Sequence, residues 1–176
     1  MKRILLLTFL VTALFGQTID TDKSYIKFKV RNMGIRDVSG TIADMQGTVI
    51  FDSAQLDSSI FDVTVNVNTI DTDNTKRDNH LREKDFFDMD KWSIIRFKSK
   101  SIKQQNDGYL MIGDLTIKDV TKEVQVPFII NENDKTIIYS GGEVVNRLEY
   151  HVGVDYSNFK IGHEITIEVV CVVNMD

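Results

Sequence analysis

The sequence predicts an all-β fold, and two observations lead to this prediction. Apolar and polar residues alternate strictly in many short segments, which is the period of a strand with one buried face. Only residues 71–92 interrupt that alternation with a charged stretch. Parallel strands would need repeated crossover helices, so the strands should pair mainly antiparallel. We therefore expect an extended antiparallel β-barrel of about eight strands with one short helix, and a two-sheet sandwich is the alternative.

The alternating segments also predict which side chains point inward. Residues 24–31 alternate apolar residues with lysine and arginine, and residues 60–68 alternate an aromatic residue and three valines with polar residues. Residues 164–173 repeat the pattern near the C-terminus. The interior row expected from all segments includes Phe28, Val30, Phe51, Val63, Val65, Val67, Phe97, Leu115, Ile117 and Phe128.

Glycine and proline mark expected interruptions of the strands. Residues 34–40 begin and end with glycine, which predicts a short link. Apolar residues before and after Gly113 fall in opposite phases, which predicts a bulge in residues 109–117. Pro127 cannot donate a hydrogen bond to a ladder, so its side of the strand should be an edge, an end or a bulge.

The charged stretch predicts a short helix over about residues 75–84. Thr75 and Asp78 have the spacing of a capping box, in which both side chains satisfy unpaired N–H groups of the first turn. Leu81 is the only apolar residue of this helix, so the helix cannot bury a face of its own. It should cover an opening of the barrel, anchored by apolar residues within and beyond it, namely Leu81, Phe86, Phe87 and Trp92.

The first sixteen residues resemble a secretory signal peptide. A basic start, Lys2 and Arg3, precedes an apolar run over residues 4–15, which is shorter than the roughly twenty residues of a membrane span. We expect removal of residues 1–16, a single domain over residues 17–176 and a periplasmic or secreted protein. No cysteine stands at the cleavage point to carry a lipid anchor, so no stable membrane insertion is expected.

Charge and composition limit the partners and the chemistry. Removal of Lys2 and Arg3 leaves 19 basic against 26 acidic residues, a net charge of −7, which argues against nucleic acid or anionic membrane as the main partner. The sequence does not decide the oligomeric state, and a homodimer is compatible with it. The single Cys171 lies in the apolar phase, as a core residue does, and has no partner for an intramolecular disulfide.

Catalytic, metal and cofactor sites are weakly supported by the residues. The three histidines, His80, His151 and His163, lack the i,i+4 spacing of metal ligands. The aspartates of residues 71–85 alternate with lysine and arginine, which indicates a solvated, self-paired cluster. We therefore predict no catalytic residue, no metal and no cofactor. Arg77 and His80 are the candidates for contacting a ligand's polar head group.

The size of the inward residues leaves two interpretations open. A barrel of about eight strands has room to be filled by side chains or to hold one small ligand. Valine predominates in the interior row, but valine is also an ordinary strand residue. The polar helix and the aromatic residues after it favour a cavity with a lid. We expect the interior row and the four lid residues to contact an apolar lipid.

The chain resembles the YceI-like family of exported, lipocalin-like, polyisoprenoid-binding barrels over nearly its whole mature length. Arg77, Asp78, His80, Leu81, Phe86 and Phe87 match one motif of that family, and Gly113, Asp114, Leu115 and Thr116 match another. The stretches that carry the resemblance are SYIKFKVRNMGIRDVSG, GTVIFD, NTIDTDNTKRDNHLREKDFFDMDKW, IRFKS, GDLTIKDVTKEVQVPF and Asn146-Arg147. The chain departs from histidines of the family at Lys23, Asn32 and Lys118.

The resemblance implies a non-catalytic protein whose apolar interior holds an isoprenoid or another lipid tail. Our first hypothesis is therefore sequestration or transport of a long apolar lipid such as a polyisoprenoid, a quinone or a fatty chain. A small outer-membrane β-barrel is the alternative, because it would also combine a signal peptide with alternating strands. An enzyme that uses the region around His80 is a third possibility.

Overall fold

The computed structural model describes residues 18–175, and the expected signal peptide, residues 1–16, lies outside this range. One sheet of ten strands makes up most of the described chain. The strands are β1 (Thr18–Ile19), β2 (Tyr25–Asn32), β3 (Arg36–Ile42), β4 (Gln46–Ile50), β5 (Ile60–Asn66), β6 (Ile94–Gln105), β7 (Gly108–Ile117), β8 (Val120–Glu132), β9 (Thr136–Asn146) and β10 (Ile161–Asn174). One α-helix, α1 (Thr75–Arg82), and three short 3₁₀ helices, η1 (Leu56–Ser58), η2 (Val67–Thr69) and η3 (Arg147–Tyr150), complete the fold.

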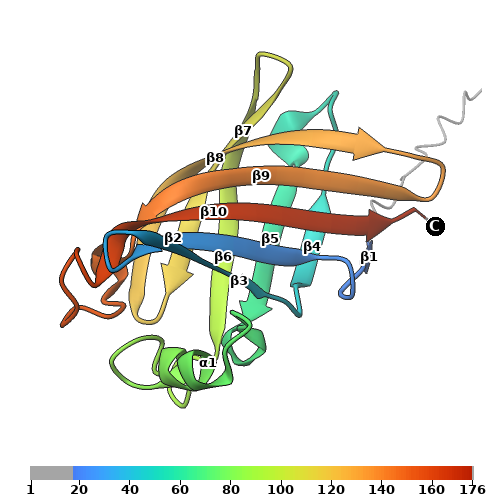
Figure 1. The fold of residues 1–176 in the computed structure, drawn as a ribbon. Helices are drawn as coiled ribbons and strands as arrows, with labels where there is room; N and C mark the ends of the chain where they lie inside the picture. Colours follow the sequence, from blue (N-terminus) through green and yellow to red (C-terminus); the bar gives the residue numbers. More distant parts are fainter. Residues whose placement is uncertain (1–17, 176) are drawn as a thin grey trace, which may run out of the picture.

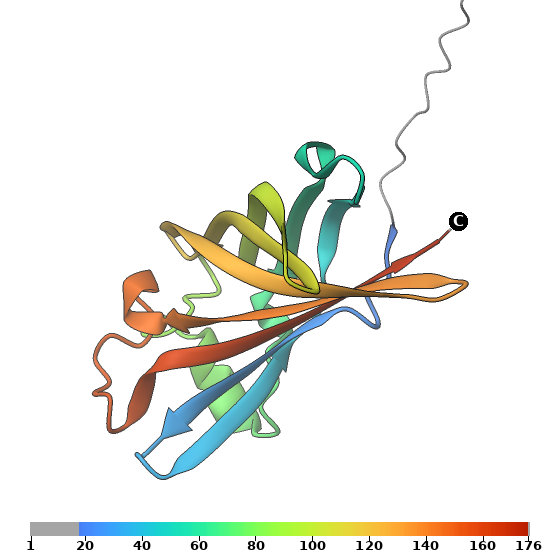
Figure 2. The same ribbon diagram turned by 90° about the horizontal axis from the view of Figure 1, so that it is seen from above.

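The sheet is antiparallel throughout and strongly curled, which confirms the predicted fold class. Its strand order is β3-β2-β10-β9-β8-β7-β6-β5-β4, and β1 pairs with β10. Figures 1 and 2 show the sheet bending around one interior, with α1 across one end. The edge strands β3 and β4 are not neighbours in this order. Residues 66–72 lie against β3 instead, where Thr41 pairs with Asp71 and Thr69 Oγ1 accepts from Ala43 N at 2.8 Å.

The predicted link between Gly34 and Gly40 is wrong, because most of it forms β3. Residues from Arg36 to Ile42 pair with β2 in continuous register. Gly40 lies within β3 and allows the Phe28 ring and the Asp71 carbonyl group to approach the backbone closely, and it forms no turn. A Cβ atom there would lie 2.6 Å from the Phe28 ring and 2.7 Å from the Asp71 carbonyl oxygen.

The bulge predicted at Gly113 lies in the neighbouring strand. Ser99 pairs with Gly113 and Ser101 pairs with Ile112, so the extra residue is Lys100 of β6. β7 keeps one phase, and Met111 faces the interior rather than Leu110 or Ile112. Gly113 is required because a Cβ atom there would lie 2.5 Å from the Phe97 ring.

Pro127 stands at an edge, as predicted. β8 pairs with β7 from Val120 to Phe128, but it pairs with β9 only from Phe128 to Glu132. Residues 120–127 therefore have no ladder on the β9 side, and the missing N–H of Pro127 removes no hydrogen bond there.

Five aromatic side chains pack together at the end of the interior away from α1. Their nearest ring centroids lie 5.0 Å apart, as between Phe51 and Tyr109 and between Phe61 and Tyr139. Phe128 completes this group, which we call the aromatic plug. Phe61 lies at the start of β5, whose other end leads toward α1. The aromatic plug therefore fills the far end of the interior.

Candidate functional site

An apolar cavity of about 380 Å³ occupies the interior between the aromatic plug and α1. This volume lies within the range of small-molecule sites, roughly 300–1,000 Å³. Most of the predicted lipid-contacting residues line it. They are Phe28, Val30, Val63, Val65, Leu81, Phe86, Phe87, Phe97, Leu115, Ile117 and Phe128.

Three predicted residues lie elsewhere. Phe51 packs within the aromatic plug, edge-on to Tyr109. Val67 is fully buried at the start of η2, where the chain leaves β5. Trp92 does not line the cavity, and the Lys91 ammonium lies 5.0 Å from its ring centroid. Strand alternation does not extend through residues 67–92, so it could not predict which side chains there point inward.

Several lining residues were not among the predicted set. The inward phase of β10 contributes Ile165, Ile167, Val169 and Cys171, and the alternation of this strand was sufficient to find them. Tyr150 and Val152 also line the cavity, from η3 and the loop after it. No periodicity marks those two positions, so only the tertiary structure identifies them.

The helix α1 is shorter than predicted and has a different cap. It ends at Arg82 rather than near Lys84, and the Asn74 side chain, not Thr75, accepts from Arg77 N at 3.0 Å. Asp78 is buried and turns away from the capping position. Its carboxylate accepts from Thr72 N at 3.0 Å and also from the Thr72 hydroxyl, which joins the helix to the preceding segment.

Arginine side chains fix α1 to the segment that precedes it, residues 68–72. Arg82 donates to Asn68 O at 2.9 Å and to Ile70 O at 2.8 Å. Arg77 donates to the Thr72 hydroxyl at 2.7 Å and to the Thr72 carbonyl at 2.6 Å. The predicted self-paired charge cluster is therefore wrong for these two arginines, because each bonds uncharged oxygen atoms.

A hydrogen-bonded group connects the lid with the loop before β10. Tyr156 Oη donates to Asp85 Oδ2 at 2.9 Å, and His80 Nε2 lies 2.8 Å from the same oxygen. Burial favours the neutral form of Asp85, but the hydrogen bonds from Tyr156 and His80 outweigh it and lower the pKa of this carboxyl group. We call these three side chains the lid latch.

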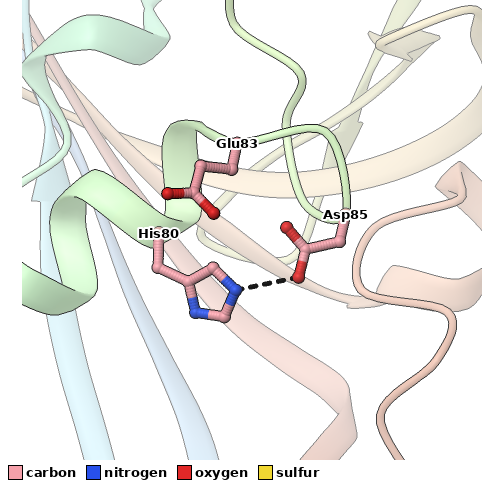
Figure 3. A group of neighbouring side chains, drawn as sticks. All are labelled: His80, Glu83 and Asp85. Atoms are coloured by element: carbon pink, nitrogen blue, oxygen red, sulfur yellow. Dashed lines mark hydrogen bonds and ion pairs between the residues drawn. The ribbon is translucent and has the colours of Figure 1, made fainter.

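Glu83 lies beside the lid latch, as Figure 3 shows. One ligand atom from each of His80, Glu83 and Asp85 lies within 4.8 Å of the others, an arrangement that no i,i+4 histidine spacing marks in the sequence. The imidazole and the Asp85 carboxylate already bond each other and Tyr156. These hydrogen bonds therefore account for the position of His80 and Asp85, which fasten the lid.

Arg147 is an internal anchor that residue patterns did not reveal as a site residue. It is only 4% exposed and lines the cavity next to the lid. All five of its N–H donors are used by backbone carbonyls, which belong to Val152, Gly153, Tyr156, Ile161 and Gly162. One buried side chain thus shapes the whole loop that carries Tyr156.

The lid and the loop before β10 contribute polar residues to the cavity wall. Arg77 and His80, the predicted head-group residues, both line the cavity, together with Tyr156. Arg77 forms no ion pair with any carboxylate in residues 18–175. The arrangement suits a molecule with a long apolar part and a polar end that accepts hydrogen bonds.

These features define a small β-protein built around one internal apolar cavity. The chain belongs to the YceI-like domain family, whose profile matches residues 17–173. Curated relatives include the UPF0312 proteins of Photorhabdus laumondii, 34% identical over 101 residues, and Yersinia pestis, 35% identical over 101 residues. Each alignment covers 57% of this chain and 53% of the relative, so the chain matches about half the length of these relatives.

Solved structures share the fold at lower sequence identity. Burkholderia cenocepacia BcnA has a TM-score of 0.81 at 23% identity, covering 88% of this chain and 98% of its own. A Campylobacter jejuni YceI protein has a TM-score of 0.73 at 24% identity, covering 100% and 99%. A polyisoprenoid-binding domain from Saccharophagus degradans has a TM-score of 0.70 at 11% identity, covering 92% and 99%. Within residues 18–175, no helix has the length and apolar character needed to cross a membrane.

Proposed function

We propose that the protein sequesters or transports a long apolar lipid of the polyisoprenoid, quinone or fatty-chain type. The observation that carries this proposal is the apolar cavity, which is plugged by aromatic rings at one end and covered by a polar helix at the other. Transfer of each CH₂ group from water into such a cavity contributes about 0.8 kcal/mol before ordering costs. A chain of ten or more carbons would therefore bind without many polar contacts.

The proposal places the ligand's polar end near α1. Arg77 and His80 would contact it, because both line the cavity at that end and each keeps one nitrogen, Nη1 of Arg77 and Nδ1 of His80, that forms no hydrogen bond within residues 18–175. The apolar part would extend past Phe97 toward the aromatic plug. The related fold of the polyisoprenoid-binding domain from Saccharophagus degradans supports the same ligand class.

The role is binding rather than catalysis, and its setting is the periplasm or the extracellular space. Burial raises the pKa of Cys171 to about 12, which makes this thiol a poor nucleophile. His80 is engaged in the lid latch. Charged side chains such as Arg96, Lys98 and Lys100 project from the outer face of β6. That polarity is the reverse of an outer-membrane barrel, whose outer face is apolar.

The first test is extraction of lipid from protein purified from its native host. Organic-solvent extraction followed by mass spectrometry should recover about one lipid per protein chain. Recovery of no lipid would count against the proposal if the same protein also failed to bind 11-(dansylamino)undecanoic acid, a fluorescent fatty acid.

The second test fills the cavity. Val63 and Leu115 flank Phe97 on neighbouring strands, so Val63→Phe combined with Leu115→Phe would occupy the space that the tail needs. We expect the affinity for the fluorescent fatty acid to fall at least about tenfold, which is 1.4 kcal/mol. Lys98→Phe adds an aromatic ring to the outer face of β6 and is the matched control. An equal loss of affinity in the control would contradict binding in the cavity.

A further inference from the structure

Large apolar side chains are exposed together where the β2–β3 turn meets the loop before β10. Ile35 is 79% exposed, Phe159 63% and Met33 50%. The two segments touch, because Met33 N donates to Lys160 O at 3.0 Å. A Cβ atom on Gly34 would lie 3.2 Å from the Phe159 ring. The three exposed side chains thus form one projecting patch, which we call the apolar tip.

The apolar tip continues the cavity wall toward the outside. Val30 and Asn32 of β2 line the cavity, and Met33 follows directly after the end of this strand. Ile161 also lines it and follows the loop that carries Phe159. Figures 1 and 2 both show the β2–β3 turn beside this loop, at the end of the sheet that α1 covers. The apolar side chains of Val30 and Ile161 therefore lie between the cavity and the apolar tip along the chain.

Basic side chains flank the apolar tip. Arg36 and Lys160 are exposed and form no ion pair within the described part of the chain. Arg31 contacts Asp37 at 3.2 Å, and Lys29 approaches the same carboxylate. The whole chain has a net charge of −5, so an attraction to phosphate groups would be confined to this region.

We propose that the apolar tip docks on a lipid bilayer, where the cavity loads or releases its ligand. A bilayer offers hydrocarbon for Ile35, Phe159 and Met33 and phosphate groups for the neighbouring cations. Three side chains are too few for a stable contact with a second protein copy, which buries roughly 800 Å² per partner. This inference rests on the proposed function, because docking supplies the lipid that the cavity would hold.

The experiment is vesicle flotation of protein that begins at Gln17. This form contains the whole described fold and lacks the apolar run of residues 4–15, which could bind vesicles by itself. Vesicles of phosphatidylcholine, alone or mixed with phosphatidylglycerol, should carry the wild-type protein with them. Ile35→Asp combined with Phe159→Asp should lower the partition coefficient at least about tenfold.

The control is Ile129→Asp, which changes a similarly exposed apolar side chain away from the apolar tip. Ile129 is 51% exposed on β8 and pairs with Ser140 of β9. The Ile129→Asp variant should float with the vesicles as the wild-type protein does. Arg36→Gln combined with Lys160→Gln should weaken flotation with the phosphatidylglycerol vesicles more than with phosphatidylcholine alone, because only the former carry net negative charge.

Two outcomes would overturn the docking proposal: no flotation of the wild-type protein with either vesicle, or equal flotation of the wild type and the Ile35/Phe159 variant. Uptake of 11-(dansylamino)undecanoic acid without vesicles separates this proposal from the proposed function. The tip variant should retain that uptake, since the substitutions lie outside the cavity. If the wild type floats through its tip but takes up no fatty acid, the docking surface stands and the cavity function fails.

Discussion

The Tyr156 hydroxyl donates a 2.9 Å hydrogen bond to the Asp85 carboxylate and thereby joins two segments 71 residues apart. Asp85 follows the helix that covers the cavity, and Tyr156 belongs to the loop that Arg147 anchors. A backbone bond from Gly153 N to Asp85 O, 2.8 Å long, lies in the same place. The lid is thus fastened at Asp85 to a loop that Arg147 holds through its carbonyl groups.

Tyr156→Phe should loosen this fastening without opening a cavity in the core. The variant loses one hydrogen bond to a charged group at a partly exposed site, so we expect about 0.5–1.5 kcal/mol less stability in urea unfolding. Stopped-flow displacement of the dansyl fatty acid should show faster release than in the wild type. Tyr25→Phe, on the exposed face of β2, is the control, and an equal acceleration there would contradict the lid assignment.

The lid latch should weaken in acid. Burial raises the pKa of Asp85, the bonds from Tyr156 and His80 lower it more, and the folded-state pKa therefore lies below the ordinary 3.8. A lowered folded pKa contributes stability above about pH 4, and this contribution disappears as pH falls through the lowered pKa. Asp85→Asn should have a lower Tm than the wild type at about pH 7, and the difference should shrink below about pH 4.

A matched control for this titration is Asp134→Asn, in the exposed turn between β8 and β9. We expect this variant to follow the wild-type Tm over the whole pH range. If the difference between the wild type and Asp85→Asn stayed constant down to about pH 3, the Asp85 charge would not be the source of the stability.

Arg147 should be among the least replaceable residues of the chain. Arg147→Lys can supply at most three N–H donors to five carbonyls, and Arg147→Met supplies none. We expect losses of about 3 kcal/mol or more in urea unfolding, with the methionine variant worse. Arg96→Met breaks an exposed pair with Asp62 that solvent screens, so it should cost far less stability. Equal losses at both arginines would contradict the anchoring role.

The Cys171 thiol should be nearly inert in the folded protein. It is buried on β10, and burial raises its pKa to about 12, so little thiolate exists at about pH 8. Ellman's reagent should react slowly with the native protein and at the rate of a free thiol in urea. Because Cys171 lines the cavity, the dansyl fatty acid should slow the native reaction further. Rapid native labelling would show that the cavity opens readily to water.

Periodicity alone was sufficient for most of the strands, although not for β3, and for most of the cavity wall. Inward side chains such as Phe28 and Val65 follow from alternation, because successive residues of a strand point to opposite faces. The lid residues Leu81, Phe86 and Phe87 were predicted in another way: a polar helix with one apolar side chain cannot bury a face of its own and should cover an opening of the barrel. Their contact with the cavity agrees with that argument.

The remaining features depend on contacts between distant segments. Lys100, rather than a residue of β7, is the bulged residue, and this follows only from the pairing of β6 with β7. Arg147 and Tyr156 become site residues only because the loop before β10 folds onto the lid. No local spacing in the sequence predicts this contact between the loop and the lid. An antiparallel β-fold with an apolar interior follows from the residue pattern alone, since alternation is a local property. How that interior is plugged, anchored and covered depends on packing between distant segments and is visible only in the folded chain.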